Sequence, residues 1–439
     1  MTAPQRLPGV DPTAILVWPA RQLAALRRFG RMAAQLWQRN PPLRPDAASL
    51  PDYYEPLLHN LALPQEPPVP LDPRFEREAP AERQTIDRVA AIAARTVIAN
   101  YCKAKAADPA APALRDQHAK QHGCVEASFI VSPDLPAEFE TALFRRGARY
   151  RAIVRFSNAQ GWPQSDRNAD GRGMAIKLRD VAGRTMLDEM TAAPAAGGPA
   201  PPAGEQDFLL TNFPVFFAGT VADYTELMQI LSMPTGRLLQ RAAMMSRFLL
   251  FFLRRPPQAW IFIQQAIRKI PSPLRETYHS MTPFLFGADR VVRYVAAPAG
   301  DLAADPPGQW RQPGDWSYLR QAMAAELDIE RAGARRPGAA FRFSMRVLPN
   351  ASPAEVEDAS RDWRGPAVRE VELARLEIPM QQFDTEANFL LGQKLSFNPW
   401  NCLPEHRPLG GLNRMRLAVY LASARARHLL NLAGPGRMA

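Results

Sequence analysis

The sequence predicts an α+β fold in which an antiparallel sheet or barrel is accompanied by helices. Short β-rich segments gather between residues 124 and 217, helical spacing precedes them, and strands and then a helix return after residue 290. With 439 residues, of which 46% are hydrophobic, the chain is long enough for a sizeable core and is typical of a globular protein.

The first hundred residues predict helices and an extended arm. Residues 12–38 carry apolar side chains at spacings of three and four. This predicts an amphipathic helix packed on the protein or a partner subunit, with peripheral membrane contact as the alternative. Residues 41–80 hold 11 prolines, which predicts an extended arm, and residues 84–103 resume helical spacing. We therefore divide the chain into an N-terminal region, 1–105, and a core, 106–439.

Strands are predicted where β-branched and aromatic residues alternate or run together. These segments are 128–131, 150–156, 174–178, 290–295, 340–347 and 371–378. The last of them alternates largely between apolar and charged residues, which indicates one buried face. The low-complexity segment 191–204 predicts a loop, residues 221–270 predict helices interrupted at prolines, and a helix returns near 413–430.

Charge and cysteine content narrow the class of protein. The formal charge is +11, but the 48 arginines and 6 lysines are scattered without a long basic run, so nucleic acid is not an expected partner. Cys102, Cys124 and Cys402 lie far apart, which predicts reduced thiols and a cytoplasmic protein. The start of the sequence has no signal-peptide pattern, and no apolar run reaches the roughly 18 residues of a membrane span.

Several short motifs occur in a fixed order along the core. They are Arg115-Asp-Gln-His118-Ala-Lys120, Val154-Arg-Phe-Ser157, Asp170-Gly-Arg-Gly173, Thr211-Asn-Phe-Pro-Val-Phe-Phe217, Ser396-Phe-Asn-Pro-Trp400, Glu405-His-Arg-Pro-Leu-Gly410 and Arg416-Leu-Ala-Val-Tyr420. In this order they resemble the heme catalases, and in particular short bacterial catalase-related proteins without the C-terminal helical domain. The resemblance implies an eight-stranded antiparallel β-barrel surrounded by helices, heme b as cofactor, a peroxide as substrate and a homo-oligomer.

On one side of a heme, His118 is the candidate acid–base catalyst. An imidazole has a pKa near neutral, so it can take a proton from one peroxide oxygen and return it to the other. The resemblance implies that Ser157 hydrogen-bonds this imidazole and fixes its orientation. It also implies that Asn212 hydrogen-bonds the peroxide oxygens. Taken singly, each of these residues is equally consistent with a structural role.

On the other side, Tyr420 is the candidate iron ligand. A tyrosinate ligand needs a lowered pKa, and Arg416, four residues earlier, lies on the same face of a helix and supplies a positive charge. Fork-shaped arginines suit the heme propionates. The resemblance places three of them, Arg115, Arg155 and Arg427, at the propionate positions.

The sequence also departs from the catalase pattern. Ala418 and Ala422 replace the Phe and Asp of the tyrosine signature. Gln117, directly before His118, and Gln121, directly after Lys120, also differ from the residues that catalases usually have there. The leading hypothesis is a heme-dependent catalase or peroxidase. The first alternative is a heme enzyme that rearranges fatty-acid or other organic hydroperoxides. The second is a heme-binding or interaction protein without turnover.

Overall fold

The structure is a computed structural model that describes residues 71–168, 170–191, 204–233, 237–268, 270–300, 316–328, 338–363, 365 and 367–433. The predicted helix at 12–38, most of the arm at 41–80 and most of the loop at 191–204 lie outside the described residues. The proposed division after residue 105 stays a prediction.

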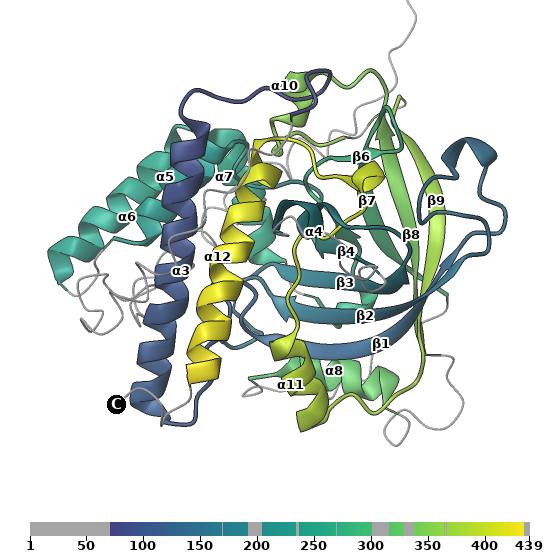
Figure 1. Cartoon of the computed structure of the whole chain (residues 1–439). Helices are drawn as coiled ribbons and strands as arrows, with labels where there is room; N and C mark the ends of the chain where they lie inside the picture. Colours follow the sequence, from purple (N-terminus) through teal and green to yellow (C-terminus); the bar gives the residue numbers. More distant parts are fainter. Residues whose placement is uncertain are drawn as a thin grey trace, which may run out of the picture.

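Eight antiparallel strands close into a barrel (Figure 1). Their order is β5-β4-β3-β2-β1-β9-β8-β7, and pairing of β5 with β7 closes the ring, while β6 adds a short hairpin to β7. The strands are β1 (Gln121–Val131), β2 (Arg149–Asn158), β3 (Arg172–Val181), β4 (Gly204–Thr211), β5 (Tyr278–His279), β6 (Phe284–Phe286), β7 (Arg290–Ala299), β8 (Ala339–Leu348) and β9 (Arg369–Ile378). The expected α+β class and eight-stranded antiparallel barrel are confirmed.

Helices pack around the outside of the barrel, and most of them lie along one side of it (Figure 1). Those in the described part of the chain are α3 (Glu82–Ala107), α4 (Met186–Thr191), α5 (Val221–Leu231), α6 (Leu238–Leu253), α7 (Pro256–Ile267), α8 (Tyr318–Leu327), α10 (Pro353–Val356), α11 (Glu386–Lys394) and α12 (Gly411–Ala433). Helices α3 and α12 run side by side, and α5, α6 and α7 lie beyond α3.

Small residues form the contact between α3 and α12. Ala90 and Ala94 of α3 pack in one buried cluster with Ala418, Ala422 and Ala426 of α12. Side chains of this size allow two helices to approach closely. The two alanines that depart from the catalase tyrosine signature, Ala418 and Ala422, therefore have a packing role here: they make room for α3.

The barrel interior is filled by side chains. Alternate residues of each strand point inward. Phe129, Phe208 and Phe343 meet there, with ring centroids 4.8 Å apart for Phe208–Phe343 and 5.1 Å apart for Phe129–Phe343. Because this core is packed with aromatic rings, a large ligand has to bind outside the barrel.

The pattern-based strands all fall within observed strands, but β4 was missed. Its first residues are polar, and Gln206 and Asp207 are nevertheless buried. Asp207 lies 2.8 Å from Lys177 Nζ of the neighbouring strand, and its carboxylate accepts a hydrogen bond from the Asn398 backbone amide. The buried polar side chains of this strand find hydrogen-bond and ion-pair partners elsewhere in the fold. A search for hydrophobic patterns in the sequence cannot reveal such partners.

A buried ion cluster fixes the start of α12. The Arg414 guanidinium donates to Glu82 Oε1 at 2.7 Å, to Glu76 Oε1 at 2.8 Å and to Glu357 at 3.2 Å. Glu76 also accepts from the Gly410 backbone amide, whose residue has a φ of 86°. These contacts join the segment before α3, the N-terminus of α3, the end of α10 and α12.

Cys102, Cys124 and Cys402 form no disulfide with one another. None of the described helices is long and apolar enough to cross a membrane.

His406 makes stability depend on pH. It is fully buried between Phe144 and Phe286, and no hydrogen bond from the described residues reaches either ring nitrogen. Burial lowers its pKa to about 3. The unfolded chain, with an ordinary histidine pKa near 6.5, binds more protons between pH 6.5 and pH 3. Through this residue, the free energy of unfolding should therefore fall by about 1.4 kcal/mol for each unit by which the pH drops.

Denaturant unfolding at pH 6 and pH 4.5 should show a smaller loss of unfolding free energy for His406→Phe or His406→Leu than for wild type. Equal losses would contradict this assignment.

Candidate functional site

A cavity of about 820 Å³ lies between the outer face of the barrel and the helices. Strands β2, β3 and β4 form one wall through residues at alternate positions. These are Arg155 and Ser157, Gly173 and Ala175, and Leu209 and Thr211. They are cross-strand neighbours in the antiparallel register, so they form one compact surface. Helix α12 and the segment before β1 form the facing walls, and α5, α6 and α7 close the far end.

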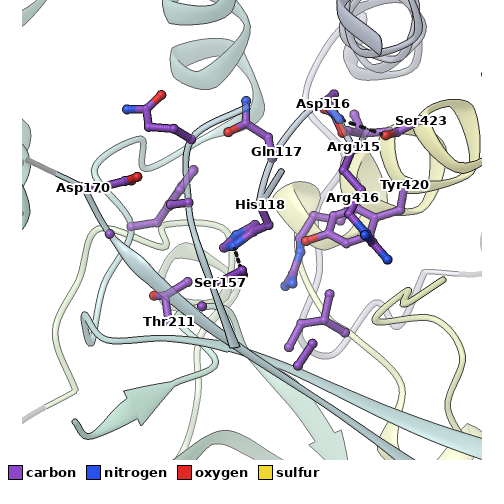
Figure 2. Close-up of a pocket in the computed structure, with 18 of the residues that line it drawn as sticks. Arg115, Asp116, Gln117, His118, Ser157, Asp170, Thr211, Arg416, Tyr420 and Ser423 are labelled. Carbon is purple, nitrogen blue, oxygen red and sulfur yellow. Dashed lines mark hydrogen bonds between the residues drawn. The ribbon is translucent and has the colours of Figure 1, made fainter. Parts of the chain in front are cut away.

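His118 enters the cavity from the segment before β1 (Figure 2). Its φ is 56°, a left-handed backbone conformation, and its backbone amide donates to the Ala159 carbonyl at 3.0 Å. Its Nδ1 lies 3.0 Å from Ser157 Oγ. Burial, followed by the positive charges of Arg155 and Arg115, lowers the pKa of His118 to about 3. The imidazole is therefore neutral at neutral pH and can accept a proton.

Gly173 makes room for this imidazole. A Cβ at Gly173 would lie 2.5 Å from His118 Cε1 and Nδ1 and 3.1 Å from Ser157 Oγ. A glycine at the end of the Asp170–Gly173 motif permits the close approach of another group. The group that approaches is the His118 ring itself.

Tyr420 and Arg416 lie on α12, on the other side of the cavity from Ser157 (Figure 2). The Arg416 guanidinium carbon is 5.5 Å from the centre of the Tyr420 ring. Arg416 Nη1 also donates to Thr282 Oγ1 at 3.0 Å and to Asn413 Oδ1 at 3.1 Å. Within the described part of the chain, no hydrogen bond involves the Tyr420 hydroxyl. The tyrosine and the arginine thus lie together as the spacing predicts, and the phenol oxygen is available to a ligand.

Among the arginines that line the cavity, Arg115, Arg155 and Arg427 lie close to one another and have no carboxylate partner among the described residues. Arg155 donates to the His118 carbonyl at 3.0 Å, and Arg427 donates to Ser396 Oγ at 2.9 Å. Arg115 and Arg427 both donate to the Leu395 carbonyl. All these partners are neutral groups, which leaves the positive charge of the cluster uncompensated.

The electrostatics of this arginine cluster favour an anion. Burial lowers the pKa of Arg155 and of Arg427 to about 10, and burial together with repulsion by these two lowers the pKa of Arg115 well below its usual value. Arg155 Nε and Arg427 Nε are buried and have no hydrogen-bond partner in the part of the chain that the structure describes. A carboxylate would relieve the repulsion and would offer acceptors to arginine donors.

Asn212 does not line the cavity, although its neighbour Thr211 does. Its Oδ1 accepts from the Arg172 backbone amide at 2.8 Å, and its Nδ2 donates to Glu276 at 3.3 Å. Both ends of the amide are thus occupied by the protein. The peroxide-orienting role stays a prediction for this residue.

The sequence analysis assigned no role to two further parts of the cavity. Asp170 lines it, and burial raises the pKa of this carboxyl to about 6. The far end is lined by Phe217, Leu227, Phe248 and Phe262 from α5, α6, α7 and the segment before them. The sequence feature that could have indicated this apolar end is the long run without Asp or Glu from residue 227 to 275.

The fold is catalase-like. A fungal catalase structure aligns with a TM-score of 0.53 and 16% identity, covering 76% of this chain and 64% of that one. Catalase A from Saccharomyces cerevisiae aligns with a TM-score of 0.53 and 15% identity, covering 76% of this chain and 66% of that one. A bacterial catalase aligns with a TM-score of 0.51 and 16% identity, covering 76% of this chain and 62% of that one. The chain thus spans slightly less than two thirds of each catalase. No protein-family model and no curated protein sequence matches it.

The Gly173 contact gives a test of the site geometry. Gly173→Ala should destabilise the protein by about 1–3 kcal/mol, because the new methyl group collides with the His118 ring. In a His118→Ala background the same change should cost much less, because the ring is gone. Denaturant unfolding of the four proteins gives the coupling free energy.

Gly171→Ala is the matched control, since its Cβ would meet only the Ala159 methyl group at 3.3 Å. A cost of Gly173→Ala that does not change when His118 is removed would show that the ring does not lie against this glycine.

Proposed function

We propose that this protein is a heme-dependent oxidoreductase that metabolises hydrogen peroxide, as a catalase or peroxidase. The observation that carries the proposal is one cavity in which the His118–Ser157 pair faces the Tyr420–Arg416 pair. The catalase-like fold supports it at the level of architecture. Cytoplasmic location and homo-oligomeric assembly remain predictions.

The residues fit heme b. The cavity volume of about 820 Å³ falls within the range of roughly 300–1,000 Å³ that ligand sites occupy. The uncompensated arginine cluster suits two propionates. No group of three or more His, Cys, Asp or Glu side chains in the described residues suits a metal ion. An iron bound to Tyr420 therefore needs ligands from outside the protein, and porphyrin nitrogens supply them.

The side chains around the cofactor have separate tasks. Tyr420 would ligate the iron as tyrosinate, with Arg416 compensating its charge. When bound, heme iron supplies the redox chemistry of O–O cleavage. Arg115, Arg155 and Arg427 would hold the propionates through charge-assisted hydrogen bonds.

His118 moves the proton. With Nδ1–H donating to Ser157 Oγ, the other nitrogen, Nε2, is the acceptor for a peroxide proton, which it returns to the leaving oxygen as water forms. A second hydrogen peroxide molecule acts as reductant in the catalase reaction, so two molecules give two water molecules and one oxygen molecule.

The apolar far end of the cavity favours a second candidate, an organic hydroperoxide as substrate. Phe217, Leu227, Phe248 and Phe262 offer no hydrogen bonds to a small peroxide, but they suit an alkyl chain. The product of such a substrate, an alcohol or a rearranged oxide, distinguishes reduction from isomerisation.

The assay is peroxide turnover by heme-loaded protein, with hydrogen peroxide and with a long-chain hydroperoxide. His118→Ala should lower turnover by about 10²–10⁴-fold, because it removes the proton carrier. Ser157→Ala should lower it by about tenfold or less. Ser423→Ala, a serine on α12 that also lines the cavity, should leave it unchanged.

Wild-type turnover should also fall at acid pH, where His118 becomes protonated and loses its acceptor. Because burial lowers the pKa of His118, this fall should lie below the ordinary histidine pKa of about 6.5. Heme-loaded wild type that turns over neither substrate would exclude the enzyme and favour a binding protein. Turnover that survives His118→Ala would exclude the proposed proton carrier.

A further inference from the structure

The outer surface of α6 and the adjacent part of α7 is unusually apolar. Leu239 is 82% exposed, Leu238 68% and Leu253 66%. Together with Leu249 and Leu250 of α6 and Trp260 of α7, they account for six of the ten large hydrophobic residues exposed in the described part of the chain. We call these six residues the leucine face. Their concentration on two helices sets them apart from isolated exposed side chains.

Helix geometry explains how α6 comes to have two apolar sides. Successive residues turn by about 100°. Met244, Phe248, Phe251 and Phe252 point toward α5 and α7 and are buried in one cluster. The leucines fall on the opposite side and remain exposed. A helix that is apolar on nearly all sides is typical of an element covered on both faces.

The charges around the leucine face have one sign. No Asp or Glu occurs between Leu227 and Arg275. Arg237, Arg247 and Arg254 are exposed on or beside α6, and none forms a salt bridge within the described residues. The nearest acids, Asp223 and Glu226, are already paired with Arg255.

We propose that the leucine face is a docking surface for an anionic lipid bilayer. The leucines and Trp260 would insert at the level of the headgroups, and the arginines would contact anionic headgroups. A second copy of this chain fits less well, since a symmetric contact would place the same arginines against each other. No spanning segment is needed, which agrees with the absence of a membrane-crossing helix among those described.

The inner side of the same helices leads to the cavity. Phe248 of α6 and Phe262 of α7 are in contact with one buried cluster and also line the cavity's apolar end. Docking would therefore place this end of the cavity close to the lipid. The docking surface itself does not depend on heme or on catalysis.

The test is flotation of the full chain with vesicles of neutral phosphatidylcholine, alone or with 30% anionic phosphatidylglycerol. Wild type should float with the anionic vesicles, and salt should weaken this binding. Leu239→Glu/Leu253→Glu should lower the partition coefficient at least about tenfold, because it removes two inserted leucines. Arg247→Gln/Arg254→Gln should lower it by roughly tenfold on anionic vesicles only.

Leu390→Glu/Leu432→Glu is the matched control: both leucines are exposed, 45% and 79%, but they lie on α11 and α12. This control should float as wild type does. Wild type that fails to float, or equal losses from both leucine pairs, would overturn the proposal. So would a Leu239→Glu/Leu253→Glu variant that floats normally but changes the oligomeric state in sedimentation velocity, which would assign the face to a second copy.

Discussion

The position of α12 against the barrel depends on the buried Arg414 cluster. Arg414 is 7% exposed and is held by Glu76, Glu82 and Glu357, and these charges raise its pKa above the ordinary arginine value. Removing Arg414 would deprive the buried carboxylates of Glu76 and Glu82 of this partner, at a cost of about 3–5 kcal/mol. Tyr420, Arg416 and Arg427 all follow Arg414 on the same helix, so this single anchor sets the depth and rotation of three site residues at once.

The strand wall of the cavity, which faces α12, is positioned by a different constraint: side chains alternate between the two faces of each strand. Phe156 points into the barrel, so its neighbours Arg155 and Ser157 point out into the cavity. A shift of one residue in the β2–β3 register would turn Ser157 toward the barrel interior or would remove Gly173 from beneath His118. The aromatic packing inside the barrel therefore indirectly fixes the groups outside it.

Much of the fold followed from the sequence because its signals are local. The alternation in 371–378 and the helical spacing at 84–103 and 413–430 appear in β9, α3 and α12. Strand β4 could not be found in this way, because Gln206 and Asp207 are satisfied by residues distant in sequence. The motifs indicated a shared site for His118, Ser157, Tyr420 and Arg416, and these four residues line one cavity.

The site was less predictable where its geometry depends on distant contacts. Asn212 matches the catalase motif, yet its amide is engaged by Arg172 and Glu276, and no local pattern reports such partners. The apolar end of the cavity arises only when α5, α6 and α7 fold over it. Likewise, Ala418 and Ala422 looked like losses from a signature, whereas their small size lets α3 pack against α12.

The central claim is that Tyr420 binds the iron of a heme in this cavity. The most direct measurement is the absorption spectrum of heme-supplemented wild type, Tyr420→Phe and Tyr224→Phe, the last being another tyrosine that lines the cavity. A high-spin ferric Soret band in wild type and Tyr224→Phe that shifts or disappears in Tyr420→Phe is the predicted result. Absence of heme uptake by wild type, or identical spectra for all three proteins, would contradict the claim.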